Sequence, residues 1–280
     1  MNKIYTNTIN NEKYICIENE NDMILAKNKQ IFNIVLTSRG EFRFEEKNID
    51  FVKNYSDDII SISITTYQNF DYSAIHYLTN LNEIAIEVLA TDNQELDFIH
   101  FPKLEKLTFD WRKKTKNLDK LYNLKELLIS KYKKENLSEF SELSKLETLF
   151  VWQSSIENLE GGDNLSSVKR LSLYGDRKLT SLKGIEKFKN LTILEIDGCK
   201  SIGSINEISS LENLEILKID NCGDIESLKP IQHLKKLKEL SFAESTNILD
   251  GDLSPCKGIK SVGFMERKHY THKYADLNIR

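Results

Sequence analysis

Residues 191–213 read LTILEIDGCKSIGSINEISSLEN, and residues 214–234 read LEILKIDNCGDIESLKPIQHL. The two adjacent segments are copies of one pattern that begins L-x-x-L-x-L-x-x-C. After the cysteine an apolar residue recurs at every third position. One copy cannot enclose a core by itself, and it buries its apolar side only by stacking on the next copy. The stretch therefore predicts a repeat solenoid.

The second leucine of this pattern can be followed outward in both directions, and it recurs at nearly constant spacing. We expect each L-x-L to form a short strand whose two apolar residues point inward, because side chains alternate along a strand. Successive strands should pair in parallel with these positions in register. The aligned positions are Ile62, Ile84, Leu107, Leu127, Leu149, Leu171, Leu194, Leu217, Leu240 and Val262.

The half of each repeat that follows the strand has apolar residues at a spacing of three. Leu179, Leu182, Ile185 and Phe188 are one example. A period of three without a long amphipathic run favours 3₁₀ turns over α-helices. The expected fold class is an α/β repeat solenoid, with a parallel sheet on one face and short 3₁₀ or turn segments on the other.

This pattern resembles the leucine-rich repeat family over roughly residues 59–267. The ninth-position cysteine is similar to the cysteine-containing variety, and the short return segments are similar to bacterial, internalin-like repeats. The resemblance implies a horseshoe whose concave parallel sheet binds a protein ligand. Other copies depart from the family's usual ninth-position asparagine and carry Arg112, Tyr132, Ser154, Asp176, Ser245 and Arg267.

Three segments are predicted along the chain. Residues 1–55 lack the repeat and are expected to form a β-rich N-terminal cap, with residues 14–18 as one strand. Residues 31–46 are expected to form a β-hairpin that turns at Gly40. A separate binding domain is the alternative for this segment. Residues 56–267 form the solenoid of about ten repeats, and residues 268–280 form a C-terminal cap or tail.

Composition narrows the classes of partner. The net charge of −4 and the pI near 5.9 are unfavourable for a nucleic-acid partner, which needs a clustered basic face. Apolar runs are too short for a membrane span, and the segment 1–20 lacks the apolar core of a secretory signal. These features favour a cytoplasmic protein. The content of Asn, Lys and Ile is typical of an AT-rich genome.

The four cysteines are too few for a disulfide framework, and none forms a Cys-x-x-Cys pair. Cys199 and Cys222 occupy equivalent positions in adjacent repeats. A redox pair or half of a metal site is one interpretation, but two small buried thiols in a reducing compartment are preferred. The sequence predicts no catalytic, cofactor-binding or metal-binding residue.

The outward strand positions predict a binding surface. Large apolar side chains recur there on three consecutive strands, and carboxylates flank them on either side. Tryptophan and tyrosine are frequent anchors of interfaces. The carboxylates suit a basic protein partner. The alternatives are aromatic side chains that pack on one another and a solvated acidic face. The predicted partner-binding residues are Asp110, Trp111, Leu128, Phe150, Trp152, Tyr174, Asp197 and Asp220.

A second outward position alternates in charge through Glu105, Lys125, Glu147 and Lys169. Strands in a sheet lie about 4.8 Å apart, so neighbouring residues of this series face opposite charges. We interpret the series as a ladder that fixes strand register, with ligand binding as the alternative.

Three functions remain open after these observations. The first is a non-enzymatic protein-binding module of bacterial cytoplasm that neutralises one partner, as an immunity protein blocks a toxin. The second is a regulatory or scaffolding subunit that positions an enzyme. The third is an enzyme or a delivered effector. The oligomeric state is not predicted.

Overall fold

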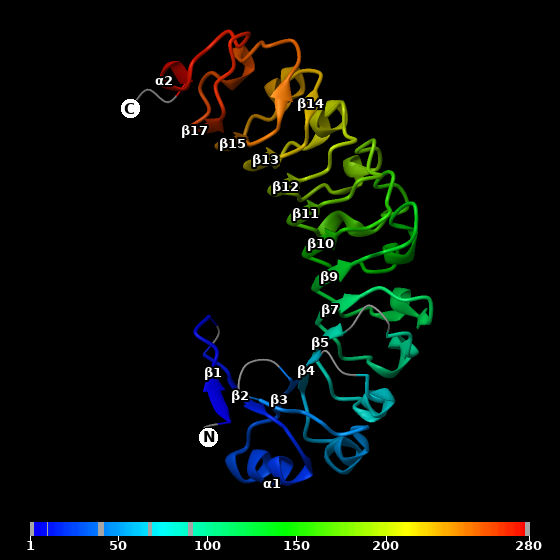
Figure 1. Ribbon diagram of the computed structural model, residues 1–280. Coiled ribbons are helices and arrows are strands. Elements are labelled where there is room, and N and C mark those ends of the chain that lie inside the picture. Colours follow the sequence, from blue (N-terminus) through cyan, green and yellow to red (C-terminus); the bar gives the residue numbers. More distant parts are fainter. Residues whose placement is uncertain (1–2, 10, 39–41, 67–68, 89–91, 278–280) are drawn as a thin grey trace. The chain divides into compact units, whose positions relative to one another are not determined.

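The computed structural model describes residues 3–9, 11–38, 42–66, 69–88 and 92–277. The chain forms two compact units, Met1–Lys125 and Glu126–Arg280. Both units consist of a sheet whose strands are connected by short return segments (Figure 1). In the second unit the strands lie on the inner side of a curve and the return segments on the outer side (Figure 1).

The sheet of the first unit has the strand order β1-β2-β3-β4-β5-β7. Strand β1 pairs antiparallel with β2, and the remaining pairs are parallel. A short parallel pair, β6 (Leu96–Asp97) with β8 (Thr115–Lys116), lies outside this sheet. The sheet strands are β1 (Ile4–Thr6), β2 (Lys13–Cys16), β3 (Asn33–Thr37), β4 (Ser61–Thr66), β5 (Glu83–Val88) and β7 (Lys106–Asp110).

The sheet of the second unit is parallel throughout its described strands, in the order β9-β10-β11-β12-β13-β15-β17. A separate parallel pair joins β14 (Asp224–Ile225) to β16 (Asn247–Ile248). The sheet strands are β9 (Glu126–Ser130), β10 (Thr148–Trp152), β11 (Arg170–Tyr174), β12 (Ile193–Asp197), β13 (Ile216–Asp220), β15 (Glu239–Phe242) and β17 (Ser261–Phe264).

The return segments are short 3₁₀ helices, as the period of three predicts. In the first unit they span Asp50–Tyr55, Ser73–Tyr77, Phe98–His100 and Leu118–Lys120. In the second unit they span Ser138–Phe140, Leu165–Ser167, Ile185–Lys187, Asn206–Ser210, Lys229–His233 and Ser254–Cys256. The described α-helices are α1 (Glu20–Lys29) and α2 (Tyr274–Leu277).

The predicted register is confirmed within both units. Ile62 pairs with Ile84, which pairs with Leu107. In the second unit the aligned positions pair in an unbroken series from Leu127 to Val262. These inward residues are at most 2% exposed, so the stack buries one continuous apolar row along each unit's sheet.

The N-terminal segment differs from the prediction in two respects. The prediction of a β-hairpin over residues 31–46 is wrong, because residues 42–46 form no strand and β3 pairs in parallel with β2 and β4. The predicted turn residue Gly40 lies outside the described residues. The parallel stack also begins before residue 62, since Ile15 pairs with Ile34 and Ile34 with Ile62. Residues 13–16 confirm the predicted strand.

Helix α1 connects the first two parallel strands and has a defined start. The Asn19 side chain accepts a hydrogen bond from the backbone of the first turn, and the Asp22 side chain accepts one from the backbone of Asn19. This reciprocal arrangement is a capping box, which satisfies amide groups that the helix leaves unpaired. Lys3 pairs with Asp22 at 2.7 Å and with Glu18 at 2.7 Å, which attaches the start of the chain to the helix.

The C-terminal segment folds against the last repeat. The Tyr270 hydroxyl accepts a hydrogen bond from the amide of Ile248, and the His269 ring bonds to the carbonyl of Ile248 at 2.9 Å. The Tyr270 ring packs against Phe242 and Phe264, which are the last inward residues of β15 and β17. These contacts cover the apolar end of the stack.

The ninth position of the repeat is buried through consecutive copies of the second unit. Its side chains are directed at the carbonyl groups of the preceding strand: Cys199 Sγ lies 3.7 Å from Leu173 O, Cys222 Sγ lies 3.5 Å from Ile196 O, and Thr246 Oγ1 lies 2.7 Å from Ile219 O. Thr246 occupies this position in its copy, whereas the predicted Ser245 is exposed.

The predicted burial of the two equivalent cysteines is confirmed. Cys199 and Cys222 are free thiols in adjacent repeats, and both are fully buried. Burial raises the pKa of the Cys222 thiol to about 11, and it raises the pKa of Cys199 further above the ordinary range. Both sulfur atoms therefore stay protonated at neutral pH, when they are weak nucleophiles.

Asp176 occupies the same buried position with a group that cannot donate. Its Oδ1 accepts a hydrogen bond of 2.6 Å from the amide of Ser154, but its buried Oδ2 has no hydrogen-bond partner. Equivalent side chains donate to the preceding strand, which an ionised carboxylate is unable to do. Burial raises the pKa of Asp176 to about 6, and the hydrogen bonds from Ser154 only partly oppose this.

We expect Asp176→Asn to raise the free energy of unfolding at pH 7 by about 1–3 kcal/mol. The folded-state pKa of Asp176 lies above the unfolded value, so ionisation costs stability as the pH rises from about 4 to about 6. An amide keeps the acceptor for Ser154, adds a donor and carries no charge. Urea unfolding at pH 7 and at pH 4 measures the effect, which should shrink at pH 4. A gain that is equal at both pH values would contradict the assignment.

Candidate protein-binding surface

The parallel register of the second unit places outward side chains in two rows across the sheet. Each row is built by residues that are direct partners on adjacent strands. The first row contains Leu128, Phe150, Ser172, Glu195 and Lys218, and the second contains Ser130, Trp152, Tyr174, Asp197 and Asp220. Six of the eight predicted partner-binding residues therefore lie on one face, in the predicted order.

The aromatic residues of the second row remain accessible. Trp152 is 39% exposed and Tyr174 is 45% exposed, although their rings pack at a centroid distance of 6.0 Å. In the first row Leu128 and Phe150 are half-buried, and the Arg170 guanidinium lies 5.3 Å from the centre of the Phe150 ring. The mutual packing that was the alternative interpretation thus occurs, but it leaves the two larger aromatic side chains open to solvent.

Glu195 is neutralised by the chain's own cations. Its carboxylate pairs with Arg170 at 2.7 Å and with Lys218 at 2.9 Å. Burial opposes ionisation of Glu195, but the hydrogen bonds from Lys218 and Arg170 outweigh it and lower the pKa. This carboxylate is therefore engaged within the sheet.

Asp220 is also engaged within the chain. Its Oδ1 accepts hydrogen bonds of 2.7 Å from the Ser241 hydroxyl and from the amide of Ala243. Asp197 differs, because no cation pairs with it in the part of the chain that the structure describes. Burial is the main cause that raises the pKa of Asp197, and the neighbouring charges of Asp220 and Glu244 raise it as well. A hydrogen bond with the Asn221 side chain partly opposes this rise. A cation beside Asp197 would relieve this repulsion.

The remaining two predicted residues lie in the first unit. Asp110 is the last residue of β7, and its carbonyl accepts hydrogen bonds of 3.2 and 3.3 Å from the Arg112 guanidinium. Trp111 follows directly and is half-buried. The other six predicted residues belong to the second unit.

The predicted charge ladder forms ion pairs at the base of the strands. Lys125 pairs with Glu105 and Lys169 pairs with Glu147, both at 2.8 Å. All four side chains are about half exposed, so each pair contributes on the order of 0–1 kcal/mol. Their geometry supports the interpretation as a register device.

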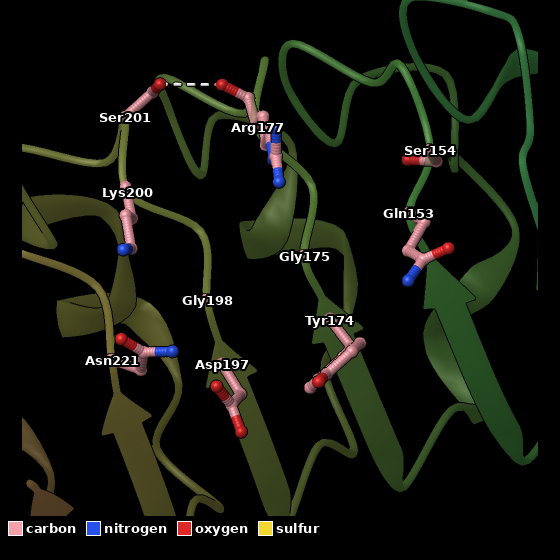
Figure 2. Close-up of a pocket in the computed structure, with 10 residues that line it drawn as sticks. All are labelled: Gln153, Ser154, Tyr174, Gly175, Arg177, Asp197, Gly198, Lys200, Ser201 and Asn221. Carbon is pink, nitrogen blue, oxygen red and sulfur yellow. Dashed lines mark hydrogen bonds between the residues drawn. The ribbon is translucent and has the colours of Figure 1, made fainter. Parts of the chain in front are cut away.

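Sequence reasoning missed a pocket at the turns that follow β10 to β13. We call it the turn trough, and its volume is about 810 Å³. Figure 2 shows Tyr174 and Asp197 on one side of Gly175 and Gly198, with Arg177 and Lys200 on the other side. The signal was a shared spacing, since Arg177 and Lys200 each follow their glycine by two residues. The trough is lined by Gln153, Ser154, Tyr174, Gly175, Arg177, Asp197, Gly198, Lys200, Ser201 and Asn221.

Among the described residues, no group of three or more His, Cys, Asp or Glu side chains is arranged to hold a metal ion. Among the same residues no helix has the length and apolar character needed to cross a membrane.

The parallel sheet, the 3₁₀ return segments and the apolar register together define a leucine-rich-repeat solenoid, and the predicted resemblance is confirmed. Residues 175–245 match the family described as R13L1/DRL21 LRRs. No curated protein sequence matches the chain.

Solved structures of internalins share this architecture. The functional domain of InlJ from Listeria monocytogenes, which includes a cysteine ladder, is 17% identical with a TM-score of 0.59, and the match covers 85% of this chain and 50% of that domain. Internalin C2 from Listeria monocytogenes is 23% identical, covers 60% and 74%, and has a TM-score of 0.46. Internalin InlF from that organism is 14% identical, covers 86% and 84%, and has a TM-score of 0.44. The likeness to InlJ concerns the fold, and this chain spans half of that domain's length.

Proposed function

We propose that this chain is a non-enzymatic protein-binding module whose main contact surface is the outward sheet face of the second unit. The observation that carries the proposal is the pair of exposed aromatic side chains, Trp152 and Tyr174, on adjacent strands. Leu128 and Phe150 extend the apolar area beside them. Exposed apolar clusters of this kind mark interaction sites, and aromatic residues dominate the binding energy of interfaces.

The chemistry of the partner follows from the charges that the sheet leaves open. Asp197 lies next to Tyr174 in the same row, and Asp220 and Glu244 add negative potential beside it. A basic side chain of the partner would be attracted there, and such complementarity mainly accelerates association. The net charge of −4 makes nucleic acid an unfavourable partner. The cellular location that we propose for this function is the bacterial cytoplasm.

Within this function we favour an inhibitor of the immunity type, which would block one basic protein by covering its active surface. A scaffolding subunit is the alternative. The two roles differ in their effect on the partner's activity. If the recovered partner is an enzyme or toxin and the chain abolishes its activity at equimolar concentration, the inhibitory role is supported. Unchanged activity in a stable complex would contradict it.

We expect Trp152→Ala to weaken binding of the partner by about 2 kcal/mol or more, because a large aromatic anchor is removed from the centre of the surface. The partner is recovered by affinity capture and identified, and then produced for titration calorimetry. Thermal unfolding should change little, since the side chain is 39% exposed.

The matched control is Leu249→Ala, which removes an apolar side chain that is 54% exposed outside the sheet face. Its affinity for the partner should equal that of the wild type. If Trp152→Ala and Phe150→Ala both bind like Leu249→Ala, the sheet face is not the binding surface. The N-terminal segment or the outer side of the repeats would then be tested.

A further inference from the structure

The turn trough is formed because two successive repeats carry glycine directly after the strand. Gly175 and Gly198 have φ angles of 67° and 68°, and neither has a side chain to fill the space above it. Their amide groups donate to the carbonyls of Asp197 at 2.8 Å and of Asp220 at 3.1 Å. The backbone donors on the trough floor are therefore used, and recognition of a ligand depends on the side chains of the walls.

The two walls carry opposite charge. On the strand side, Asp197 stands beside the exposed ring of Tyr174. On the outer side, Arg177 and Lys200 are exposed, and within the described ranges their side chains make no ion pair or hydrogen bond with the rest of the chain. Figure 2 shows the two cationic side chains across the glycines from Asp197. A single charged group would satisfy one wall and be repelled by the other.

The dimensions suit a short extended segment of polypeptide. The trough is lined by residues from the turns after four consecutive strands, Gln153 to Asn221, which is three strand spacings or about 14 Å. An extended chain advances about 3.4 Å per residue, so about four residues fill this length. Successive side chains of an extended chain point to opposite sides. Two adjacent residues of opposite charge would therefore address both walls together.

We propose that the turn trough binds an extended segment of a protein partner in which a basic and an acidic residue are adjacent in sequence. The basic side chain lies against the Tyr174 ring and pairs with Asp197, combining a cation–π contact with an ion pair. The acidic side chain lies between Arg177 and Lys200. The inference rests on the proposed function, because it assigns this segment to the partner that covers the neighbouring aromatic surface.

The test uses the full chain and four eight-residue peptides in a neutral frame of glycine, serine and threonine. Their central residues are arginine–glutamate, arginine–glutamine, glutamine–glutamate or glutamine–glutamine. Binding is followed by NMR titration of the ¹⁵N-labelled chain. We expect the arginine–glutamate peptide to bind at least about tenfold tighter than the glutamine–glutamine peptide, with the largest shifts at Gly175 and Gly198.

Substitutions in the two walls show which wall binds the basic side chain of the peptide and which binds the acidic one. Asp197→Asn should weaken the peptides that contain arginine by about fivefold, and the glutamine–glutamate peptide should bind it as it binds the wild type. The double variant Arg177→Gln and Lys200→Gln should weaken only the peptides that contain glutamate. Asp163→Asn is the control, because this carboxylate is exposed and lies outside the trough. Equal affinity of the four peptides, or a loss that does not depend on the matching peptide charge, overturns the inference.

The double variant Arg177→Gln and Lys200→Gln separates this inference from the proposed function, because Asp197 belongs to both the sheet face and the trough. When the recovered partner loses affinity for Trp152→Ala but not for the double variant, the trough inference falls and the sheet-face function stands. When the double variant weakens the partner and Trp152→Ala does not, the sheet face falls and the trough remains the recognition site.

Discussion

Arg112→Met is expected to lower the free energy of unfolding by about 3–5 kcal/mol. Arg112 occupies the ninth position of its repeat, and its side chain is 4% exposed. Its guanidinium pairs with the carboxylate of Asp92, which is 7% exposed, and it also contacts the hydroxyl of Tyr72. Methionine preserves length and apolar volume but leaves the Asp92 carboxylate in a buried site without its cation. Urea unfolding of the purified chain measures the loss.

Lys116→Met is the control for this substitution. Lys116 pairs with Glu95 at 2.6 Å, but both side chains are about half exposed, so solvent screens the pair and we expect no measurable change in the free energy of unfolding. Combining Arg112→Met with Asp92→Leu should recover part of the lost stability, because the stranded charge is removed as well. The buried pair would lose its assigned role if Arg112→Met and Lys116→Met unfolded at the same urea concentration.

Leu217→Ala is expected to lower the free energy of unfolding by about 2–5 kcal/mol, through lost apolar burial and the cavity that remains. Leu217 is fully buried, and its register partners on either side are Leu194 and Leu240. The cavity would therefore interrupt the apolar row shared by three repeats. In a solenoid the contacts between neighbouring repeats supply much of the stability.

Leu249→Ala removes the same number of atoms from a side chain that is 54% exposed, and its effect should stay within about 0.5 kcal/mol. Both variants are compared with the wild type by urea unfolding at one protein concentration. A loss for Leu217→Ala as small as the loss for Leu249→Ala would mean that Leu217 does not support the stack.

The repeat could be predicted from Ile62 onward because its spacing is nearly constant. Inward positions at such regular intervals determine both the strands and their partners. The parallel pairing of the earlier strands escaped prediction because the intervals between Ile15, Ile34 and Ile62 are unequal, and neither matches the later repeats. Helix α1 fills the first interval, and the capping residues Asn19 and Asp22 were its available signal.

The N-terminal hairpin was predicted from alternation alone. Residues 41–46 alternate phenylalanine with charged residues, which is typical of a half-buried strand. In the structure Phe44 is buried and its amide donates to the carbonyl of Thr37, but no ladder forms over the described part of this segment. The apolar residue in this alternation is therefore explained by the burial of one aromatic side chain, and no strand is needed.

Strand register allowed us to predict which residues of the candidate surface share a row, but not which contacts their side chains make. Register places Trp152, Tyr174 and Asp197 in one row, and the structure does so. Register does not show which charged side chains are paired with other groups of the same chain. Asp220 is engaged by Ser241 from the next repeat, and this contact depends on side-chain conformations that spacing does not specify. The trough likewise depends on turn geometry.

One backbone feature makes the trough adjustable during evolution. The residue directly after each strand from β9 to β13 has a positive φ, and at Gln153 and Asn221 this residue has a side chain that closes an end of the trough. Glycine adopts such angles without strain. A single Gln153→Gly change would therefore open one more repeat and lengthen the trough by about 4.8 Å, without rebuilding the fold. The length of ligand that the trough can hold can thus evolve in steps of one repeat, and each step needs a change in one codon.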